Sequence, residues 1–292
     1  MRVAVLASPD SWYAADLRRA AAHDFEITTA AFSGIASRWD GACLHVTAGS
    51  CDLGSLDAVL VRTMPPGSLE QVVFRMDALG RLEAAGTTVV NSPRSIEVAV
   101  DKYLTTARLA TVGLNSPRTV VCQTAEEAIS AFVELGGDVV VKPLFGGEGR
   151  GLLRVGDENL AWRTFQTLAR LDAVLYLQEF VAHEGFDVRL MVIGNRVWGM
   201  RRINEQDWRT NVSRGARTEP WVVDNACAEL ALSAAGAVGA SVAGVDVLLG
   251  RDGRRYVLEV NAVPGWRALC RTLNLDVARL VLEHIAESVK AK

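Results

Sequence analysis

The stretch GVDVLLGRDGRRYVLEVNAVPG (Gly244 to Gly265) reads as two apolar strands joined by a tight turn. Asp252-Gly253 is a dipeptide typical of two-residue hairpin loops. If these two residues form the loop, Asp246 on the first strand lies directly opposite Glu259 on the second. Glu259 and Asn261 then point to the same face, because side chains alternate along a strand. The sequence therefore predicts a hairpin that gathers three oxygen-bearing side chains on one patch.

This patch has the chemistry of a metal site. Two facing carboxylates repel each other unless a cation lies between them. Asp246, Glu259 and Asn261 offer only oxygen ligands, which favours Mg²⁺ or Mn²⁺, and Mg²⁺ held by few carboxylates usually takes phosphate oxygens as well. The alternative is a solvated hairpin end, but the apolar runs around both acids favour an enclosed site. We therefore expect a metal site that handles a nucleotide.

The composition is that of an ordinary globular protein. The chain has 292 residues, 50% of them hydrophobic, which suffices for a large core in two or three lobes. A net charge of -3 disfavours a nucleic-acid partner, and the five cysteines form no CxxC pair and suit reduced thiols. The first residues do not resemble a signal peptide, and no apolar run reaches the roughly 18 residues of a membrane span. We expect a cytoplasmic protein without a membrane or nucleic-acid partner.

The pattern along the chain predicts three regions. Residues 1–95 alternate strand-like and helix-like segments, which indicates a parallel α/β domain. Residues 96–181 open with a helix and continue as a compact lobe of strands and helices. Residues 182–292 hold paired strands, a helix, the acidic hairpin and a terminal helix. The expected fold class is therefore α/β, with a parallel domain followed by two α+β lobes.

A second motif follows an apolar strand in the middle region. Lys142 ends the strand VVVK, and Gly146, Gly147, Gly149 and Gly151 follow within a few residues. Glycines let backbone N–H groups approach an anion, and a lysine beside them adds positive charge. The segment lacks the ending of a P-loop and the spacing of a dinucleotide fingerprint. It predicts a mobile cover for phosphates, with a flexible hairpin tip as the alternative.

In this order the motifs resemble those of the ATP-grasp carboxylate-amine ligases, specifically the RimK-like α-L-glutamate ligases. The resemblance runs from Asp101 to the end of the chain, and residues 1–95 correspond to a pre-ATP-grasp domain. It implies an ATP-grasp fold, with a central lobe at 96–181 that carries the glycine-rich lid and a metal-binding lobe at 182–292. It also implies ATP and two Mg²⁺ or Mn²⁺ ions as cofactors, and amide formation through an acylphosphate.

The resemblance further implies which residues bind ATP. Two lysines and the glycines would hold the phosphates, a hinge strand the adenine, an acid the ribose, and an Arg-Thr-Asn segment would lie at the phosphates. These residues are Lys102, Lys142, Gly146, Gly147, Gly149, Gly151, Gln178, Glu179, Phe180, Val181, Asp187, Arg209, Thr210 and Asn211.

For catalysis, the resemblance implies Arg202, Asn211 and Arg214, and for metal binding it implies Asp246, Glu259 and Asn261, the same three residues as the hairpin argument. Arg201-Arg202-Ile203 departs in detail from the family's usual alternation of a small residue and arginine.

Three residues outside these motifs have open roles. Arg62 ends a strand of the first region, and Arg75 lies in an apolar helix. Both suit a carboxylate-rich substrate, or else ion pairs with Glu70 or Asp77. Trp266 stands where the family has smaller residues after Pro-Gly, so acceptor recognition is expected to differ there.

Within this family, the sequence most resembles a subgroup associated with one-carbon cofactors. It implies addition of L-glutamate to a small-molecule carboxylate of the tetrahydromethanopterin or methanofuran type, or its precursor, by a homodimer or homotetramer. The alternatives are glutamate ligation to a protein terminus or carrier protein, and a non-catalytic nucleotide-binding regulator. A dinucleotide-dependent oxidoreductase is disfavoured by the missing fingerprint.

Overall fold

The computed structural model describes residues 1–41, 43–147 and 149–292. The amino-terminal region contains a parallel sheet in the order β2-β1-β6-β7, as predicted from the alternating pattern. Its strands are β1 (Arg2–Leu6), β2 (Glu26–Ala30), β6 (Ala58–Val61) and β7 (Thr88–Val90). The helices of this region are α1 (Trp12–Ala21) and α2 (Leu69–Ala84), with short 3-10 turns η1 (Phe32–Gly34) and η2 (Leu53–Ser55).

The same region carries a small antiparallel sheet that the sequence analysis missed. It consists of β3 (Ile35–Trp39), β4 (Leu44–Ala48) and β5 (Cys51–Asp52). Its strands expose Arg38 and Trp39 at one end, so the hydrophobic alternation that marks a half-buried strand is weak there.

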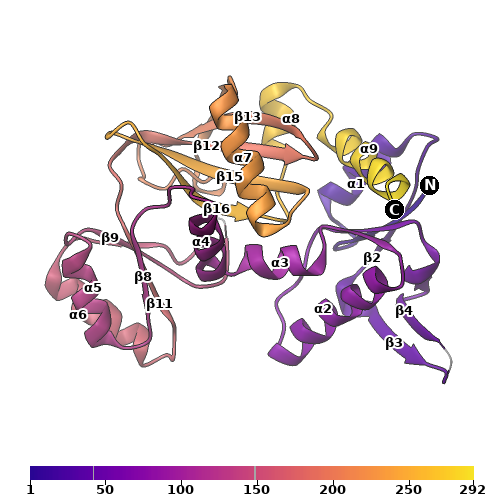
Figure 1. The fold of residues 1–292 in the computed structure, drawn as a ribbon, viewed down its shortest axis with the longest axis horizontal. Coiled ribbons are helices and arrows are strands. Elements are labelled where there is room, and N and C mark those ends of the chain that lie inside the picture. Colours follow the sequence, from indigo (N-terminus) through magenta and orange to yellow (C-terminus); the bar gives the residue numbers. More distant parts are fainter. Residues whose placement is uncertain (42, 148) are drawn as a thin grey trace.

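The middle region is an antiparallel sheet in the order β10-β9-β11-β8, with two helices packed on it (Figure 1). The strands are β8 (Thr119–Cys122), β9 (Val139–Lys142), β10 (Leu153–Val155) and β11 (Leu175–Glu179). The helices are α5 (Ala125–Glu134) and α6 (Glu158–Ala169). Two helices, α3 (Pro93–Val100) and α4 (Lys102–Thr111), connect the amino-terminal region to this lobe.

The carboxy-terminal region is a five-stranded antiparallel sheet in the order β14-β13-β12-β15-β16. Its strands are β12 (His183–Ile193), β13 (Arg196–Ile203), β14 (Arg217–Trp221), β15 (Val242–Gly250) and β16 (Arg255–Asn261). The other elements are η3 (Val212–Arg214), α7 (Asn225–Val238), α8 (Arg267–Leu273) and α9 (Val277–Lys290). Helix α9 returns to the amino-terminal region and packs against α1, so the two ends of the chain share one core (Figure 1).

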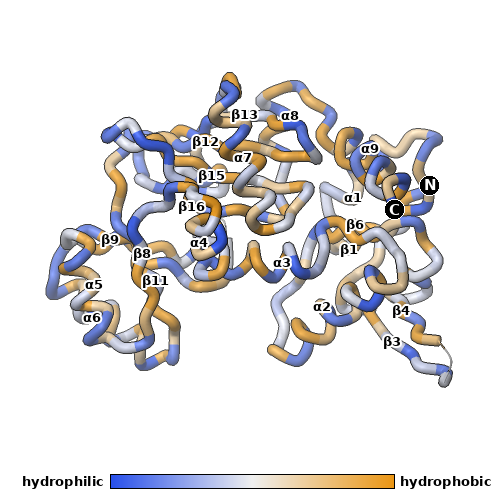
Figure 2. Tube along the Cα trace, in the orientation of Figure 1, coloured by the Kyte–Doolittle hydropathy of each residue, from blue (hydrophilic) through white to orange (hydrophobic). Residues whose placement is uncertain are grey.

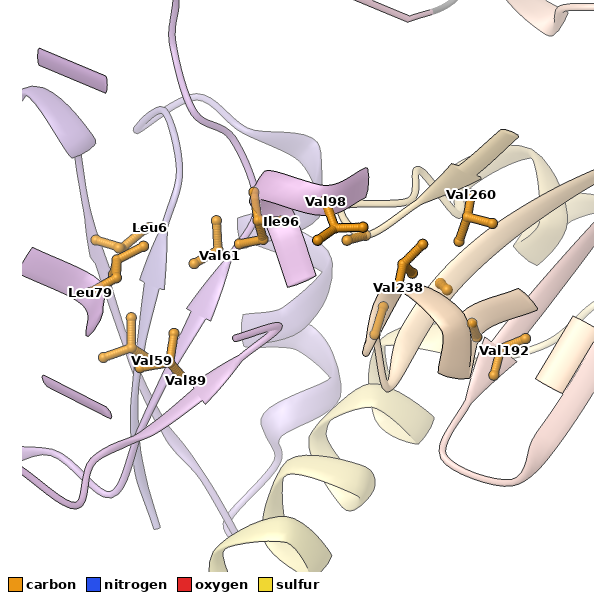
Figure 3. Close-up of a cluster of buried hydrophobic side chains, with 14 of the residues drawn as sticks. Leu6, Val59, Val61, Leu79, Val89, Ile96, Val98, Val192, Val238 and Val260 are labelled. Carbon is orange, nitrogen blue, oxygen red and sulfur yellow. The ribbon is translucent and has the colours of Figure 1, made fainter. Parts of the chain in front are cut away.

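The hydrophobic core joins the first and last regions. Figure 2 shows hydrophobic residues along β1 and β6, which are buried strands. In Figure 3, Val59 and Val61 of the first sheet lie on one side of Ile96 and Val98 of α3, and Val260 of the last sheet lies on the other. Helix α3 therefore bridges the two sheets. Within the described residues, no helix is long and apolar enough to cross a membrane.

The acidic hairpin is built differently from the predicted two-residue loop. The Gly250 N–H donates to the Arg254 carbonyl, so the loop spans three residues, 251–253, and Gly253 has a φ of 78°. That shift alone would misalign the acids. A β-bulge at Leu258 restores the alignment, because Val247 pairs with Val257 while Asp246 pairs with Glu259. The loop prediction was wrong, whereas the predicted pairing of the two acids is confirmed.

A single buried amide fixes the last sheet on the first region. The Asn91 side chain, just after β7, donates hydrogen bonds to the carbonyls of Val242 and Ala262. Its Oδ1 accepts hydrogen bonds from the backbone N–H groups of Ser241 and Val242 at 2.9 and 3.0 Å. Asn91 therefore ties the start of β15 and the end of β16 to the edge of the parallel sheet.

We expect Asn91→Ala to destabilise the protein by about 3 kcal/mol, because it leaves several buried backbone groups without hydrogen-bond partners. Urea unfolding measures the change in the free energy of unfolding. The control is Asn225→Ala, which replaces an exposed asparagine at the start of α7. Equal stability of the two variants would contradict the role given to Asn91.

Candidate active site

A cavity lies between the middle lobe and the carboxy-terminal sheet and gathers most of the predicted site residues. Those on its wall are Lys102, Lys142, Gly146, Gly147, Gly149, Gln178, Glu179, Phe180, Val181, Asp187, Arg202, Arg209, Thr210, Asn211, Asp246 and Glu259. The other three are Gly151, Arg214 and Asn261. A Cβ added at Gly151 would meet Pro143, Arg214 bonds the Gly149 carbonyl, and Asn261 lines two neighbouring cavities together with Glu259. Residues from the whole span between α4 and β16 thus converge on one place.

Two lysines enter this cavity from different elements. Lys142 ends β9 and donates to Gln178 Oε1 at 2.6 Å, and Lys102 opens α4, which Asp101 caps through the Leu104 N–H. The Lys102 ammonium donates to the Gly146 carbonyl at 2.7 Å. Burial lowers the pKa of both lysines, that of Lys142 to about 8, and their mutual repulsion contributes at Lys142. Neither bonds a carboxylate among the described residues, so together they form a site prepared for an anion.

The glycine-rich segment lies against the Arg-Thr-Asn segment. Gly149 has a φ of 70°, and a Cβ there would overlap the Asn211 amide, so only glycine fits. The Arg214 guanidinium donates to the Gly149 carbonyl at 3.3 Å. Gly215, with a φ of 88°, ends the 3-10 turn that carries Arg214. The two motifs, which are far apart in sequence, are therefore in contact, and Gly149 and Asn211 line the cavity that both lysines enter.

The segment predicted to act as the hinge begins at the end of strand β11, and its acidic side chain is already paired. Glu179 forms an ion pair with Arg118 at 2.6 Å and also accepts from the Arg118 N–H. Phe180 lies under the Arg154 guanidinium, 3.4 Å from the ring centroid, and edge-to-face against Trp208. The hinge therefore offers an aromatic and backbone surface, with the Glu179 carboxylate held aside.

Several apolar and aromatic residues of the cavity wall were not found from the sequence. They are Pro117, Val140, Leu152, His183, Trp208, Leu248 and Leu258. Most lie on strands where they read as ordinary core residues. Trp208 had a usable signal, because it directly precedes the Arg-Thr-Asn segment.

Buried charges form a network at the inner end of the cavity. Arg202 donates to both oxygens of Asp187 and pairs with Asp246 at 2.9 Å, while Arg189 donates to Asp246 at 2.9 Å. Burial raises the pKa of Asp187, although Arg202 opposes the shift. Burial also opposes ionisation of Asp246, but Arg189 and Arg202 outweigh it and lower the pKa of that carboxyl. Asp246 therefore remains a carboxylate fixed between two guanidinium groups.

Glu259 is the carboxylate of this group with the least compensation. Its nearest ion-pair contact is Arg189 at 3.9 Å, and burial together with the neighbouring Asp246 raises its pKa. A cation beside Glu259 would lower that pKa. The Asn261 Oδ1 accepts from the Val263 N–H at 2.8 Å and retains a second lone pair.

The donor set therefore fits a hard divalent cation of the Mg²⁺ class. In the part of the chain that the structure describes, no three His, Cys, Asp or Glu side chains group closely enough to hold a metal by themselves. Such an ion would depend on oxygen atoms from a bound phosphate.

Two further cavities meet the first one at Glu259. One is largely apolar and is lined by Met64, Ile96, Val100, Thr105, Val260 and Asn261, among others. The other is basic, encloses about 630 Å³, and has Arg62, Arg189, Arg202, Arg267 and Arg271 on its wall. Glu259 borders all three cavities, so ligands in them would approach one another at this carboxylate.

Comparisons with known proteins agree with this geometry. The RimK-like ATP-grasp domain matches residues 99–285. The tetrahydromethanopterin:alpha-L-glutamate ligase of Methanosarcina acetivorans is 33% identical, over 82% of both chains, and that of Methanocaldococcus jannaschii is 34% identical with the same coverage. The alpha-aminoadipate–LysW ligase LysX of Saccharolobus solfataricus is 33% identical over 72% of this chain and 78% of its own.

Solved structures show the same fold over nearly the whole chain. The ATP-grasp ligase PsnB, in complex with its minimal precursor, has a TM-score of 0.79 and 24% identity and covers 98% of both chains. The D-alanine–D-alanine ligase of Bacillus anthracis has a TM-score of 0.71 and 17% identity and covers 100% of this chain and 98% of its own. The predicted ATP-grasp fold is thereby confirmed.

We expect Arg202→Ala to cost about 3–5 kcal/mol of stability, because it leaves the buried Asp187 carboxylate without a counterion. The matched control is Arg201→Ala, one residue earlier on β13, where a partly exposed pair with Glu219 should contribute less than about 1 kcal/mol. Urea unfolding of the two variants measures the difference. A loss at Arg202 no larger than that at Arg201 would show that the network is not a stability determinant.

Proposed function

This chain belongs to the RimK-like ATP-grasp family of amide-forming ligases, and we propose that it adds L-glutamate to a carboxylate of a tetrahydromethanopterin- or methanofuran-type cofactor or its precursor. The observation that carries the proposal is the convergence of three cavities at Glu259, of which we assign one to a nucleotide and two to substrates. The match to tetrahydromethanopterin:alpha-L-glutamate ligases over 82% of both chains supports the choice of acceptor. We also propose that residues 1–95, 96–181 and 182–292 act as the three units of this site.

In the proposed reaction, ATP occupies the first cavity. Lys102 and Lys142 bind its phosphates, the glycine-rich segment covers them, and the hinge 178–181 and Asp187 lie at the nucleoside. Glu259, Asn261 and Asp246 would hold the metal, which would neutralise phosphate charge and align the phosphates. Neither lysine bonds a carboxylate within the described residues, so their positive charges suit this cavity to a polyanion.

The acceptor carboxylate then attacks the γ-phosphorus, and ADP leaves with the electrons of the broken bond. The product is an acylphosphate, whose carbonyl carbon the glutamate amine attacks while inorganic phosphate departs and the amine loses a proton. Arg202, Asn211 and Arg214 lie where negative charge builds up during these transfers. The cover formed by Gly149, Asn211 and Arg214 excludes water, which would otherwise hydrolyse the acylphosphate.

Ligation to an acidic carrier protein is the second candidate, since LysX is a relative. An arginine patch for such a partner would consist of Arg201, Arg202, Arg209, Arg214 and Arg217. In this structure, Arg201 pairs with Glu219, Arg217 with Glu219 and Glu205, Arg209 with Asp207, and Arg202 with Asp187. This internal compensation leaves little net charge to attract an acidic protein and favours a small-molecule acceptor.

A ligase assay tests the proposal. Purified protein is incubated with Mg·ATP, L-glutamate and candidate acceptors of the reduced pterin, furan, protein-tail and carrier-protein classes, and ADP release and acceptor mass are measured together. We expect one pterin or furan acceptor to gain one or more glutamyl units with stoichiometric ADP. Glu259→Ala should lose at least 100-fold in rate, because it removes a proposed metal ligand. Its melting temperature should be maintained, because the lost group is a half-buried carboxylate with a raised pKa. A mass gain only on the carrier or the protein tail would refute the small-molecule acceptor.

The pKa of Lys142 predicts a pH dependence of nucleotide binding. In the free protein this lysine loses its proton near pH 8, whereas bound phosphates favour its charged form. We therefore expect ATP affinity to be nearly constant below pH 7.5 and to fall by up to about tenfold per pH unit above pH 8. Lys142→Arg, which stays charged, should flatten the profile. Isothermal titration with a non-hydrolysable ATP analogue between pH 7 and 9.5 measures it, and a flat wild-type profile would exclude the assignment.

A further inference from the structure

The basic cavity has a feature that the ATP site does not use. Arg62, at the carboxyl end of β6, is 5% exposed and faces this cavity from the amino-terminal region. Its guanidinium lies between two aromatic rings, 4.7 Å from the Tyr13 centroid and 4.1 Å from the Trp266 centroid. It donates one hydrogen bond, to the Pro264 carbonyl at 2.6 Å. The predicted ion pair with Glu70 or Asp77 is not among the interactions of the described residues.

This leaves a buried cation without a counterion. The Arg62 Nε is buried and has no hydrogen-bond partner in the described part of the chain. Burial lowers the pKa of the guanidinium to about 10. A buried charge without a counterion is unfavourable, so we expect the guanidinium to bind an anionic partner. The surrounding cavity is the place from which an anionic partner can come.

The position of Arg62 is fixed by its neighbours. The Trp266 Nε1 donates to Asp16 at 3.0 Å, and Asp16 also bonds Arg19 on α1. Gly265 packs so closely on Tyr13 that a Cβ would lie 2.6 Å from the tyrosine oxygen. The rings that hold the guanidinium therefore cannot shift freely, and Arg62 presents its charge at a defined point, as a built ligand site requires.

The rest of the cavity adds positive charge of a different kind. Arg189 and Arg202 on its wall are compensated by Asp246 and Asp187. Arg267 and Arg271 are exposed on α8 at its rim, and no ion pair is recorded for either within the described residues. Glu259 is the acidic residue on the described wall. The positive charge of Arg62 and the two rim arginines therefore exceeds the negative charge that faces the cavity.

We propose that the basic cavity binds a substrate bearing two carboxylates, with buried Arg62 anchoring one carboxylate and Arg271 at the rim attracting the other. This inference rests on the proposed function, because it assigns a substrate to the cavity that adjoins Glu259. The dicarboxylate is either the incoming amino acid or the dicarboxylate end of the acceptor. Guanidinium groups suit either, since they bind carboxylates with two parallel hydrogen bonds.

Arg75 provides the matched control for Arg62. It too is a buried arginine of the amino-terminal region, but it donates to the Pro65 carbonyl at 2.9 Å and is not part of the cavity wall described here. Arg62→Gln and Arg75→Gln thus remove the same group from similar burial. Arg271→Gln tests the rim without disturbing the core, because that side chain is exposed.

The experiment measures the affinity of Mg·ADP-loaded protein for two probes by calorimetric titration. L-Glutamate represents the amino acid, and N-acetyl-L-glutamate, whose blocked amine cannot act as nucleophile, represents the acceptor end. We expect Arg62→Gln to lower the affinity for at least one probe by tenfold or more, which corresponds to about 1.4 kcal/mol. Arg271→Gln should weaken the same probe by a smaller factor that shrinks with added salt. Arg75→Gln should leave it unchanged.

The affinity for Mg·ADP and the melting temperature are measured on every variant. Weaker binding of glutamate alone in Arg62→Gln assigns the cavity to the amino acid. Weaker binding of the acetylated probe assigns it to the acceptor. Wild-type binding of neither probe, or affinities of Arg62→Gln within twofold of wild type, would overturn the inference. The proposed function fails separately, if the wild-type protein forms no glutamyl product in the ligase assay.

Discussion

The position of the active site depends on the side-chain amide of Asn91. Its hydrogen bonds hold Ser241 and Val242 at the start of β15 and Ala262 at the end of β16. The strands so held carry Asp246 and Glu259, and the segment that follows carries the aromatic ring against Arg62. Because buried backbone groups must find partners, the two regions cannot separate at this point without a large penalty. The cavities between them therefore have defined walls before any ligand binds.

The site contains two classes of cationic side chain, those with a bonded carboxylate and those without one. Arg202 pairs with Asp187 and Asp246, and this pairing fixes the strands β12, β13 and β15 relative to one another. Half-buried Lys142 and buried Arg62, in contrast, have no carboxylate bonded to them in the described chain, and burial lowers the pKa of both. Removing one partner of a compensated buried charge is costly, whereas an uncompensated charge can be stabilised by a ligand. The distribution of counterions thus distinguishes Arg202, whose charge is balanced within the fold, from Lys142 and Arg62, whose charges are open to a ligand.

The sequence predicted the parallel first domain, the convergence of the motifs and the pairing of Asp246 with Glu259. These follow from local patterns, namely strand alternation and the polarity of a few residues in apolar runs. The three-residue loop and the bulge at Leu258 could not be predicted, because their geometry depends on which side chains the sheet must bury. For the same reason, the contact of α9 with α1 and the pairing of Glu179 with Arg118 are properties of the tertiary structure.

Trp266 shows how a departure from a family pattern acquires meaning only in three dimensions. From the sequence it is a large residue in place of a small one. In the structure it is fully buried, packs edge-to-face on Tyr13 and forms one face of the Arg62 site. A smaller residue would leave the guanidinium without that face and open a void beside it. The ATP motifs lie elsewhere, whereas the proposed carboxylate site at Arg62 is built by contacts between the amino-terminal region and the segment after β16. On this proposal, substrate choice can change without altering the nucleotide site.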